Sequence, residues 1–559
     1  MYSLILQQSE LLPEGLNISF KVVPAFLVIA MMASFLIVGY IFAVADTDDM
    51  WVAGRSIGNI ENGAAIGANW MSAASYLGMA ALIALSGIYG LAFVVGWTAG
   101  YFVLLIFLAA QMRRFGKYTA PDFVGDRYNS DTARALGAIT TFLIGFVYSI
   151  GQARGMGLVG LYVFGDITQP LGITWMSGYQ AMMIVFMVVT IVYLTISGML
   201  GATKNQVFQY GVLIFAFLAG LFVTGFVGGY STILPHLEYG QLITELSAEF
   251  SEPFVNAPYY LWIATAFSLI FGTAGLPHVL VRFYTVENER IARWSTVWGL
   301  GFIAVLYLSA PAFAAFGTDL YSKNIGAVYG DPGMSSAAGD VIVVLATQLA
   351  GLPSWFVGIV AAGGIAAAVA TVAGLFISAS SAISHDIYTN LLKKDATQRE
   401  QMIVARLALI FVGLLTMWAA YDPTAPIAAL VSYAFALAAI VMFPMFMLGL
   451  WWENTNRQGA LAGMTSGIIL WLIPMFNEGA FGIFGWGIES LATWMPAIGS
   501  AIIGTPIVFI ITIVVSMVTK EPPEETKMMV RQCHSPEPMP RGMTAEDMVE
   551  QKRSESTDD

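Results

Sequence analysis

A single arginine, Arg154, lies in the middle of a long apolar stretch, residues 136–164. Moving a guanidinium to the depth of a bilayer costs from about 2.5 to over 10 kcal/mol, so the charge must face protein or water. A guanidinium also matches a carboxylate with two parallel hydrogen bonds. Arg154 is therefore a candidate for contacting an anionic solute or gating its path. The alternative is a structural arginine bonded to the carbonyls of a broken helix.

Two further apolar stretches are interrupted by small and polar residues. The first interruption covers residues 67–75 and the second covers residues 272–278, whose sequence is Gly-Thr-Ala-Gly-Leu-Pro-His. Pro277 cannot continue a regular helix, and glycine lowers helix stability. Broken helices at corresponding places in two halves of a transporter point to its solute site. We therefore expect the two interruptions to meet near the middle of the membrane.

Polar, aromatic and small residues in these stretches are candidate contacts for a small carboxylate. They are Asn69, Trp70, Ser72, Ser75, Arg154, Thr273 and Gly275. Aromatic residues in membrane helices more often pack or form interface belts, and Asn69 could simply bond the broken helix.

Four other residues are candidates for gating, namely Tyr76, Gln206, His278 and Asp386. His278 could carry a proton or serve as a structural hydrogen-bonding group. Asp386 could cap its helix or pair with Arg282 or Lys393. Arg113 and Arg114 are most simply determinants of membrane topology.

The composition is that of an integral membrane protein. Of 559 residues, 57% are hydrophobic and only 11% are charged, against roughly 25% charged in soluble domains. Many apolar stretches reach the ~20 residues that cross a bilayer as helix, and none alternates as a β-barrel strand would. One cysteine and four dispersed histidines predict neither disulfides nor a metal site beyond sodium. No nucleophile–base arrangement indicates an enzyme.

Hydropathy predicts an all-α polytopic protein with about thirteen transmembrane helices. They run near residues 20–45, 60–88, 89–111, 131–165, 173–199, 203–230, 259–281, 290–317, 355–384, 400–421, 424–451, 457–475 and 493–519. Lys and Arg gather in alternate loops, with Lys21 and Lys323 as exceptions. Because basic residues accumulate in the cytoplasm, we expect the N-terminus outside and the C-terminus inside the plasma (inner) membrane.

The chain divides into five predicted regions. An extracellular N-terminus (1–19) precedes an extra first helix and a cytoplasmic loop (20–58). A transport core (59–451) and C-terminal helices (452–519) follow, and then a disordered cytoplasmic tail (520–559) rich in Pro, Glu, Ser and Lys. The lipid bilayer is an expected partner and nucleic acid is not. A small membrane partner or a homo-oligomer stays open.

Several motifs resemble the sodium:solute symporter family, and within it the acetate and short-chain monocarboxylate permease branch. They are residues 49–55 (Asp-Met-Trp-Val-Ala-Gly-Arg), 71–78 (Met-Ser-Ala-Ala-Ser-Tyr-Leu-Gly), 271–278 with Arg282-Phe283, 378–388 and 457–460. They lie between about residues 45 and 470. The resemblance implies the LeuT-type fold, a five-plus-five inverted repeat with an extra first helix and trailing helices.

The resemblance also implies a sodium site between the broken second span and the ninth span. Its carbonyl ligands would be Ala68, Met71 and Ala367, with side-chain oxygens from the pair Ala370-Thr371. Two hydroxyl residues are usual at that pair in other branches, and only Thr371 is present here. An acidic residue of the family is replaced by Gln206, so the coupling ion could be sodium or a proton. The alternative is that residues 366–370 form a close-packing face.

These features predict a secondary active transporter, a cation-coupled (Na⁺ or H⁺) symporter of a small monocarboxylate such as acetate, pyruvate or propionate. No cofactor besides the coupling ion is expected. One alternative is a symporter of another organic solute such as an amino acid. Another is a transporter-derived solute sensor that acts with a separate partner chain.

Overall fold

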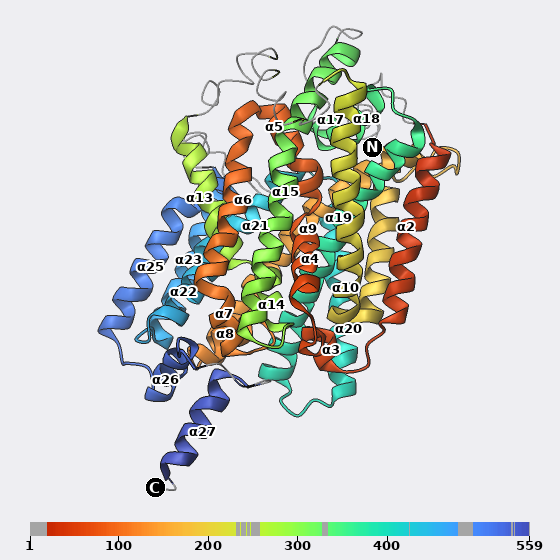
Figure 1. Ribbon diagram of the computed structural model, residues 1–559. Coiled ribbons are helices and arrows are strands. Elements are labelled where there is room, and N and C mark those ends of the chain that lie inside the picture. The colour runs from red at the N-terminus through yellow and green to blue at the C-terminus, as the bar shows by residue number, and fades with distance from the viewer. Residues whose placement is uncertain are drawn as a thin grey trace.

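The computed structural model describes residues 19–230, 258–326, 334–423, 425–478, 496–537 and 543–557, together with residues 235, 242, 246 and 540. Apart from one isolated bridge between Ile57 and Val286, the regular structure of these residues is helical. The long helices lie side by side in one bundle (Figure 1). Helices α17 (Ser336–Asp340) and α18 (Ile342–Leu349) lie at one end, and α7 (Ala109–Phe115), α8 (Ala120–Arg127) and α26 (Glu524–Cys533) lie at the other (Figure 1).

Eleven helices in the described part of the chain are long and apolar enough to cross a membrane. Two of these runs, Ala74–Phe115 and Gly178–Val227, have 42 and 50 residues. At about 1.5 Å per residue, either run would far exceed a hydrocarbon core of about 30 Å. Each contains a glycine with positive φ, Gly87 at 59° and Gly198 at 49°. The predicted count of thirteen spans divides these two runs and stays a prediction.

Further helices complete the described part of the chain, and α27 (Ala545–Thr557) projects away from the bundle (Figure 1). They are α2 (Val22–Ile41), α3 (Thr47–Val52), α6 (Leu91–Val103), α9 (Asp131–Phe164), α10 (Gly178–Val227), α15 (Glu289–Tyr321), α19 (Ser354–Ser381), α20 (Gln398–Ala419), α21 (Ile427–Leu437), α22 (Phe443–Trp451), α23 (Arg457–Glu478), α25 (Ala501–Val518) and α27 (Ala545–Thr557). Short π-helical or 3-10 turns extend several of them, among them η4 (Leu104–Leu108), η6 (Ala382–Leu392) and η7 (Ala438–Met442).

The first predicted helix break is present after α4 (Asn59–Trp70). The chain resumes as the π-helical turn η2 (Ala74–Gly78) and then α5 (Met79–Ser86). At the break, Met71 N bonds Gly67 O at 2.8 Å and Ser72 N bonds Trp70 O at 2.7 Å. A helical carbonyl accepts from the amide four residues on, so the carbonyl of Ala68 has lost its usual donor.

The second predicted break separates α13 (Tyr259–Gly275) from α14 (Pro277–Tyr284). Leu276 between them is extended, and Pro277 begins the new helix, where its missing N–H costs nothing. A Cβ on Gly272 would lie 2.5 Å from Phe435 O, and one on Gly275 would lie 2.3 Å from Ala438 O. These glycines therefore let α13 approach the backbone of α21 and η7.

The predicted disordered tail contains helix structure. Helix α26 buries Val530 and Cys533, and Arg114 on α7 donates to the carbonyls of Gln532 at 3.2 Å and Glu537 at 2.7 Å. Burial also raises the pKa of the Cys533 thiol to about 12. The composition is polar, but helical spacing places these two apolar side chains on one face. The predicted external N-terminus falls almost wholly on residues 1–18, outside the described part.

Candidate solute and cation site

The two interrupted helices meet at Asn69. Its side-chain amide donates to the carbonyl of His278 in α14 at 3.2 Å, and its own carbonyl accepts from Thr371 Oγ1 of α19 at 2.8 Å. All three residues are buried. A Cβ on Gly374 would lie 2.1 Å from Asn69 Oδ1, so α19 approaches α4 very closely. One residue therefore joins both breaks to the ninth predicted span.

Oxygen atoms without formal charge gather at this junction. The break withdraws the usual donor from the carbonyl of Ala68. The carbonyl of Met71 also lacks its usual donor, because Ser75 N bonds Ser72 O at 3.0 Å instead. Thr371 Oγ1 also bonds Ala367 O at 3.2 Å, which keeps its hydroxyl on the side of α19 that faces α4. Unwound carbonyls with a hydroxyl are the ligands that transporters use for a hard monovalent cation.

Gln206 on α10 occupies the other side of the junction. Its side-chain amide donates to Ala370 O at 2.7 Å and to Asn69 Oδ1 at 3.3 Å. Its carbonyl oxygen accepts from the guanidinium of Arg282. This arrangement fixes the orientation of Gln206, with the N–H groups toward α19. The carbonyl of Ala370 is thereby already hydrogen-bonded.

Arg282 carries the charge of this region, although the sequence indicates it only as part of a motif and as a possible partner of Asp386. Its side chain is fully buried in α14 and donates to Thr203 Oγ1 at 2.8 Å and to Gln206. Its Nε has no acceptor among the described residues. A buried cation normally has an anionic partner. Like Arg154, Arg282 lies beside apolar residues in the sequence, so the same signal indicates it.

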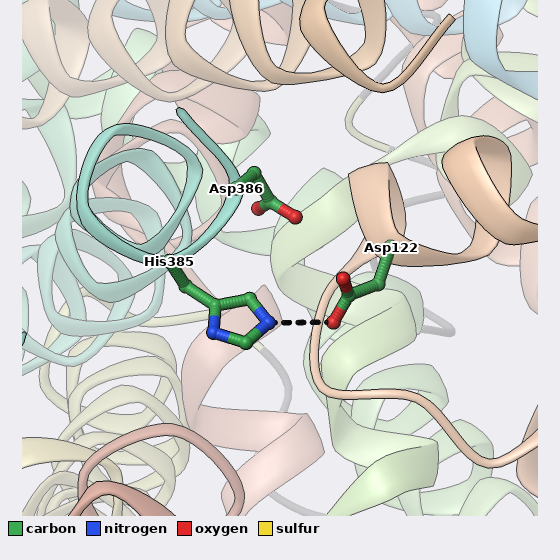
Figure 2. A group of neighbouring side chains, drawn as sticks. All are labelled: Asp122, His385 and Asp386. Atoms are coloured by element: carbon green, nitrogen blue, oxygen red, sulfur yellow. Dashed lines mark hydrogen bonds and ion pairs between the residues drawn. The ribbon is translucent and has the colours of Figure 1, made fainter. Parts of the chain in front are cut away.

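The buried carboxylates of the described chain all lie elsewhere. They are Asp122, Asp319, Asp340 and Asp386. Asp319 bonds Tyr230 and Lys323, Asp340 bonds Arg154, and the other two belong to the cluster in Figure 2. Among the described residues, this region therefore holds a buried positive charge and no carboxylate beside it.

Aromatic rings and unpaired N–H groups lie around the first break. The ring of Phe435 lies 5.5 Å from that of Trp70, 5.8 Å from that of Trp97 and 5.6 Å from that of Tyr148. His278 lies edge-on to Tyr148, with ring centroids 5.3 Å apart. Buried side-chain nitrogens here without a hydrogen-bond partner in the described chain include Trp70 Nε1, Trp97 Nε1, Gln152 Nε2 and both ring nitrogens of His278. Orphaned buried donors are costly unless a guest accepts from them.

Two predicted solute contacts, Thr273 and Gly275, and one predicted gating residue, Tyr76, have partners within the protein. Thr273 Oγ1 bonds Leu269 O of its own helix at 2.6 Å and packs on Gly100. Gly275 is a packing contact with η7, and Tyr76 Oη bonds Val360 O at 3.0 Å. Sequence could not reveal the contacts of Gly275 and Tyr76, because each depends on which helix lies opposite.

The two predicted serines lie at the first break. Ser75 Oγ bonds Trp70 O at 3.1 Å and Tyr307 Oη at 2.8 Å. Ser72 Oγ accepts from Ser75 N at 3.3 Å. Both hydroxyls therefore support the unwound backbone beside Trp70.

Arg154 lies apart from this junction. Its Nε is 2.8 Å from Asp340 Oδ2, and a second nitrogen bonds Pro423 O at 3.2 Å. Asp340 also accepts from Ile427 N at 3.4 Å. The pair therefore joins α9 to α17 and to the start of α21. Because the charge of Arg154 is already neutralised, the geometry favours a structural or gating role over direct contact with a solute.

Removing one partner of this pair should destabilise the protein. Burial raises the pKa of Asp340, while Arg154 opposes that rise. We expect Asp340→Asn to lower stability by about 3–5 kcal/mol, since it leaves a buried guanidinium uncompensated. The double variant Arg154→Gln/Asp340→Asn should recover most of that loss in thermal unfolding. Equal melting temperatures for the single and double variants would show that the two charges do not depend on each other.

A second charged cluster lies at the end of the bundle that holds α8 (Figures 1 and 2). His385 Nε2 lies 2.8 Å from Asp122 Oδ2, and Thr119 Oγ1 lies 2.9 Å from both oxygens of Asp386. Arg134 bonds Asp122 and lies 3.9 Å from Asp386. The ligand atoms of Asp122, His385 and Asp386 lie within 4.8 Å of one another, a grouping that the dispersed histidines did not predict. We interpret it as an ion-pair network that joins α8, α9 and η6.

The expected partners of Asp386 were wrong. Lys393 bonds Glu400 at 2.7 Å, and Arg282 bonds Gln206 and Thr203. Asp386 is held instead by the cluster of Figure 2. Its partners lie more than 250 residues away in sequence, so local spacing could not identify them.

Acid should weaken this cluster. Burial alone would raise the pKa of Asp122, but His385 and Arg134 outweigh it and lower the pKa to about 2. An unfolded Asp titrates near 4, so the unfolded chain binds the proton first and stability falls as pH drops from about 4 to about 2. We expect a loss of about 2 kcal/mol over that range. In Asp122→Asn the melting temperature should depend less on pH over this range. The control Asp131→Asn, at an exposed position, should keep the pH dependence of the parent.

A family model described as the sodium:solute symporter family matches residues 50–467. An uncharacterized symporter of Cupriavidus necator is 28% identical, over 88% of this chain and 90% of its own length. The uncharacterized symporter YwcA of Bacillus subtilis is 32% identical, over 86% of this chain and 89% of its own length. Neither name gives a solute, so the monocarboxylate branch stays a prediction.

Two solved structures have a similar fold. A Na⁺-coupled sialic acid symporter in a substrate-bound outward-open state covers 90% of this chain and 99% of its own, with a TM-score of 0.68 and 17% identity. Mhp1, a nucleobase-cation-symport-1 family transporter in a closed conformation, covers 87% and 98%, with a TM-score of 0.53 and 12% identity. At these identities the likeness shows the fold alone, which is the predicted LeuT-type arrangement.

Proposed function

Because this chain belongs to the sodium:solute symporter family, we propose that it couples sodium entry to the uptake of a small monocarboxylate. The observation that carries the proposal is the buried guanidinium of Arg282, whose partners are the neutral groups of Thr203 and Gln206. A carboxylate supplies the negative charge that the described core lacks. A cationic or neutral solute would leave that charge uncompensated.

The two guests would occupy neighbouring positions at the junction. Sodium would take oxygens from the Ala68 and Met71 carbonyls and from Thr371, without adding a protein charge to the core. The carboxylate would accept hydrogen bonds from the unpaired N–H groups of Trp97, Gln152 and His278. The positive charge of Arg282 would attract it. In this proposal the carbon chain of the acid would pack against the aromatic rings around Phe435, and a short chain would need the least displacement of these rings.

In this proposal, charge pairs close both ends of the solute path in this conformation. Arg154 and Asp340 close one end, and Arg134 with Asp122 and Asp386 closes the other. Opening either end would separate one set while leaving the other intact. In this proposal the two ends open one at a time, as one group of helices moves against the rest, and this gives alternating access. We place the Asp122 end in the cytoplasm, because the basic loops gather there.

The charges of the guests determine how far the solute can be concentrated. One sodium ion with one monoanion is electroneutral, so the membrane potential does no work on that pair. A tenfold sodium gradient then supplies about 1.4 kcal/mol, enough for about tenfold accumulation. A second cation would add about 2.3 kcal/mol per 100 mV.

Uptake into proteoliposomes tests the proposal. Radiolabelled acetate, pyruvate and propionate would be offered with a sodium gradient and a proton gradient imposed separately. We expect at least one of the three to accumulate with the sodium gradient alone. Accumulation of labelled amino acids in place of all three acids would refute the monocarboxylate assignment, and uptake driven only by protons would refute sodium coupling.

A further inference from the structure

A cavity of about 550 Å³ opens at the end of the bundle that holds α7 and α26. It lies between α7, the first two turns of α15 and the end of α26. Its lining includes Arg114, Arg290, Arg293, Glu289 and Trp294. Three positive side chains therefore face one carboxylate. We call it the α15 pocket.

The two arginines of α15 have no ion-pair partner among the described residues. Arg114 forms an ion pair with Glu289 at 3.1 Å and donates hydrogen bonds to carbonyls of the tail. Arg290 and Arg293 are exposed, and no hydrogen bond or ion pair of theirs occurs among the described residues. Two free guanidinium groups on consecutive turns of one helix suit an anion with several oxygen atoms, such as a phosphate.

The outer face of α15 continues from the pocket as an apolar stripe. Its exposed side chains follow helical spacing and are Trp294, Val297, Trp298, Val305 and Leu308. In a membrane protein such a face meets lipid chains, and tryptophans mark the level of the headgroups. The phosphate of a phospholipid would therefore lie at the level of the pocket, and its acyl chains would lie along the apolar stripe.

We propose that the α15 pocket binds the headgroup of an anionic phospholipid, whose acyl chains lie along the apolar stripe of α15. Arg290 and Arg293 bind the phosphate, and Trp294 packs beside the glycerol. Basic pockets at the cytoplasmic level of membrane proteins bind acidic lipids in this way. The site is separate from the solute path, so it can be tested without a transport assay.

The test uses the full-length protein, purified in detergent and stripped of lipid. Binding is measured by the rise in melting temperature on titration with phosphatidylglycerol, phosphatidylcholine or inorganic phosphate. We expect a saturable rise of several degrees with phosphatidylglycerol and none with the other two. In Arg290→Gln/Arg293→Gln the apparent affinity for phosphatidylglycerol should fall about thirtyfold, which is about 2 kcal/mol.

A matched variant separates this site from a general attraction of acidic lipid to a basic surface. Lys394→Gln/Arg399→Gln removes the same charge from exposed positions that lie outside the pocket, and it should bind phosphatidylglycerol as the parent does. Trp294→Ala should weaken phosphatidylglycerol binding even though it removes no charge. An equal loss in both double variants, or an equal response to inorganic phosphate, would overturn the proposal.

Discussion

Replacing Arg282 with glutamine is expected to lower kcat/KM for solute uptake at least a hundredfold. The guanidinium is the buried positive charge beside the junction of α4, α14 and α19. Removing one member of a buried, hydrogen-bonded charge pair costs about 2–5 kcal/mol, and about 3 kcal/mol is a hundredfold. The measurement is initial uptake against solute concentration in proteoliposomes with a fixed sodium gradient.

Two controls make the Arg282 result specific. Arg282→Lys keeps the charge and should retain part of the activity, although it loses the guanidinium fork. Arg406→Gln removes another arginine bonded to carbonyls, those of Thr195 and Val44, away from the junction, and should transport normally. Unchanged KM and kcat in Arg282→Gln would show that this charge does not serve the solute.

Replacing Thr371 with alanine should raise the sodium concentration for half-maximal uptake at least tenfold. Its hydroxyl lies between α19 and the carbonyl of Asn69, beside the carbonyls that the break of α4 exposes. Losing one oxygen ligand to a charged guest costs about 1.5–3 kcal/mol. Thr371→Val should behave alike because it removes the hydroxyl at nearly constant volume.

Serine at position 371 keeps the hydroxyl and should keep sodium affinity within a few fold. Thr416→Ala, a buried threonine on α20 whose hydroxyl has no partner in the described chain, is the matched control. An unchanged sodium dependence in Thr371→Ala would place the cation elsewhere. A change in maximal rate without a change in sodium affinity would point to helix packing instead.

The two helix breaks could be predicted from sequence because their causes are local. Pro277 lacks the N–H that a continuing helix needs, and small polar residues at 67–75 weaken α4. The membrane character and the helical class follow in the same way from composition and the length of the apolar stretches.

The partners of the buried charges could not be predicted, because they depend on tertiary contacts. Arg154 and Asp340 are 186 residues apart, and Arg282 and Gln206 are 76 apart. Both arginines look alike in sequence, yet one bonds a carboxylate and the other only neutral groups. These partners make Arg282, and not Arg154, the candidate anion-binding charge.

The central claim is that the core is complementary to a negative charge, and neutral isosteres test it most directly. Acetate and acetamide, or propionate and propionamide, differ little in shape and by one full charge. Competition with uptake of the labelled acid would be measured for each member of a pair at saturating sodium. We predict that the acids compete and that the amides do not at hundredfold higher concentration. Equal competition by acid and amide would contradict a site built around the charge of Arg282.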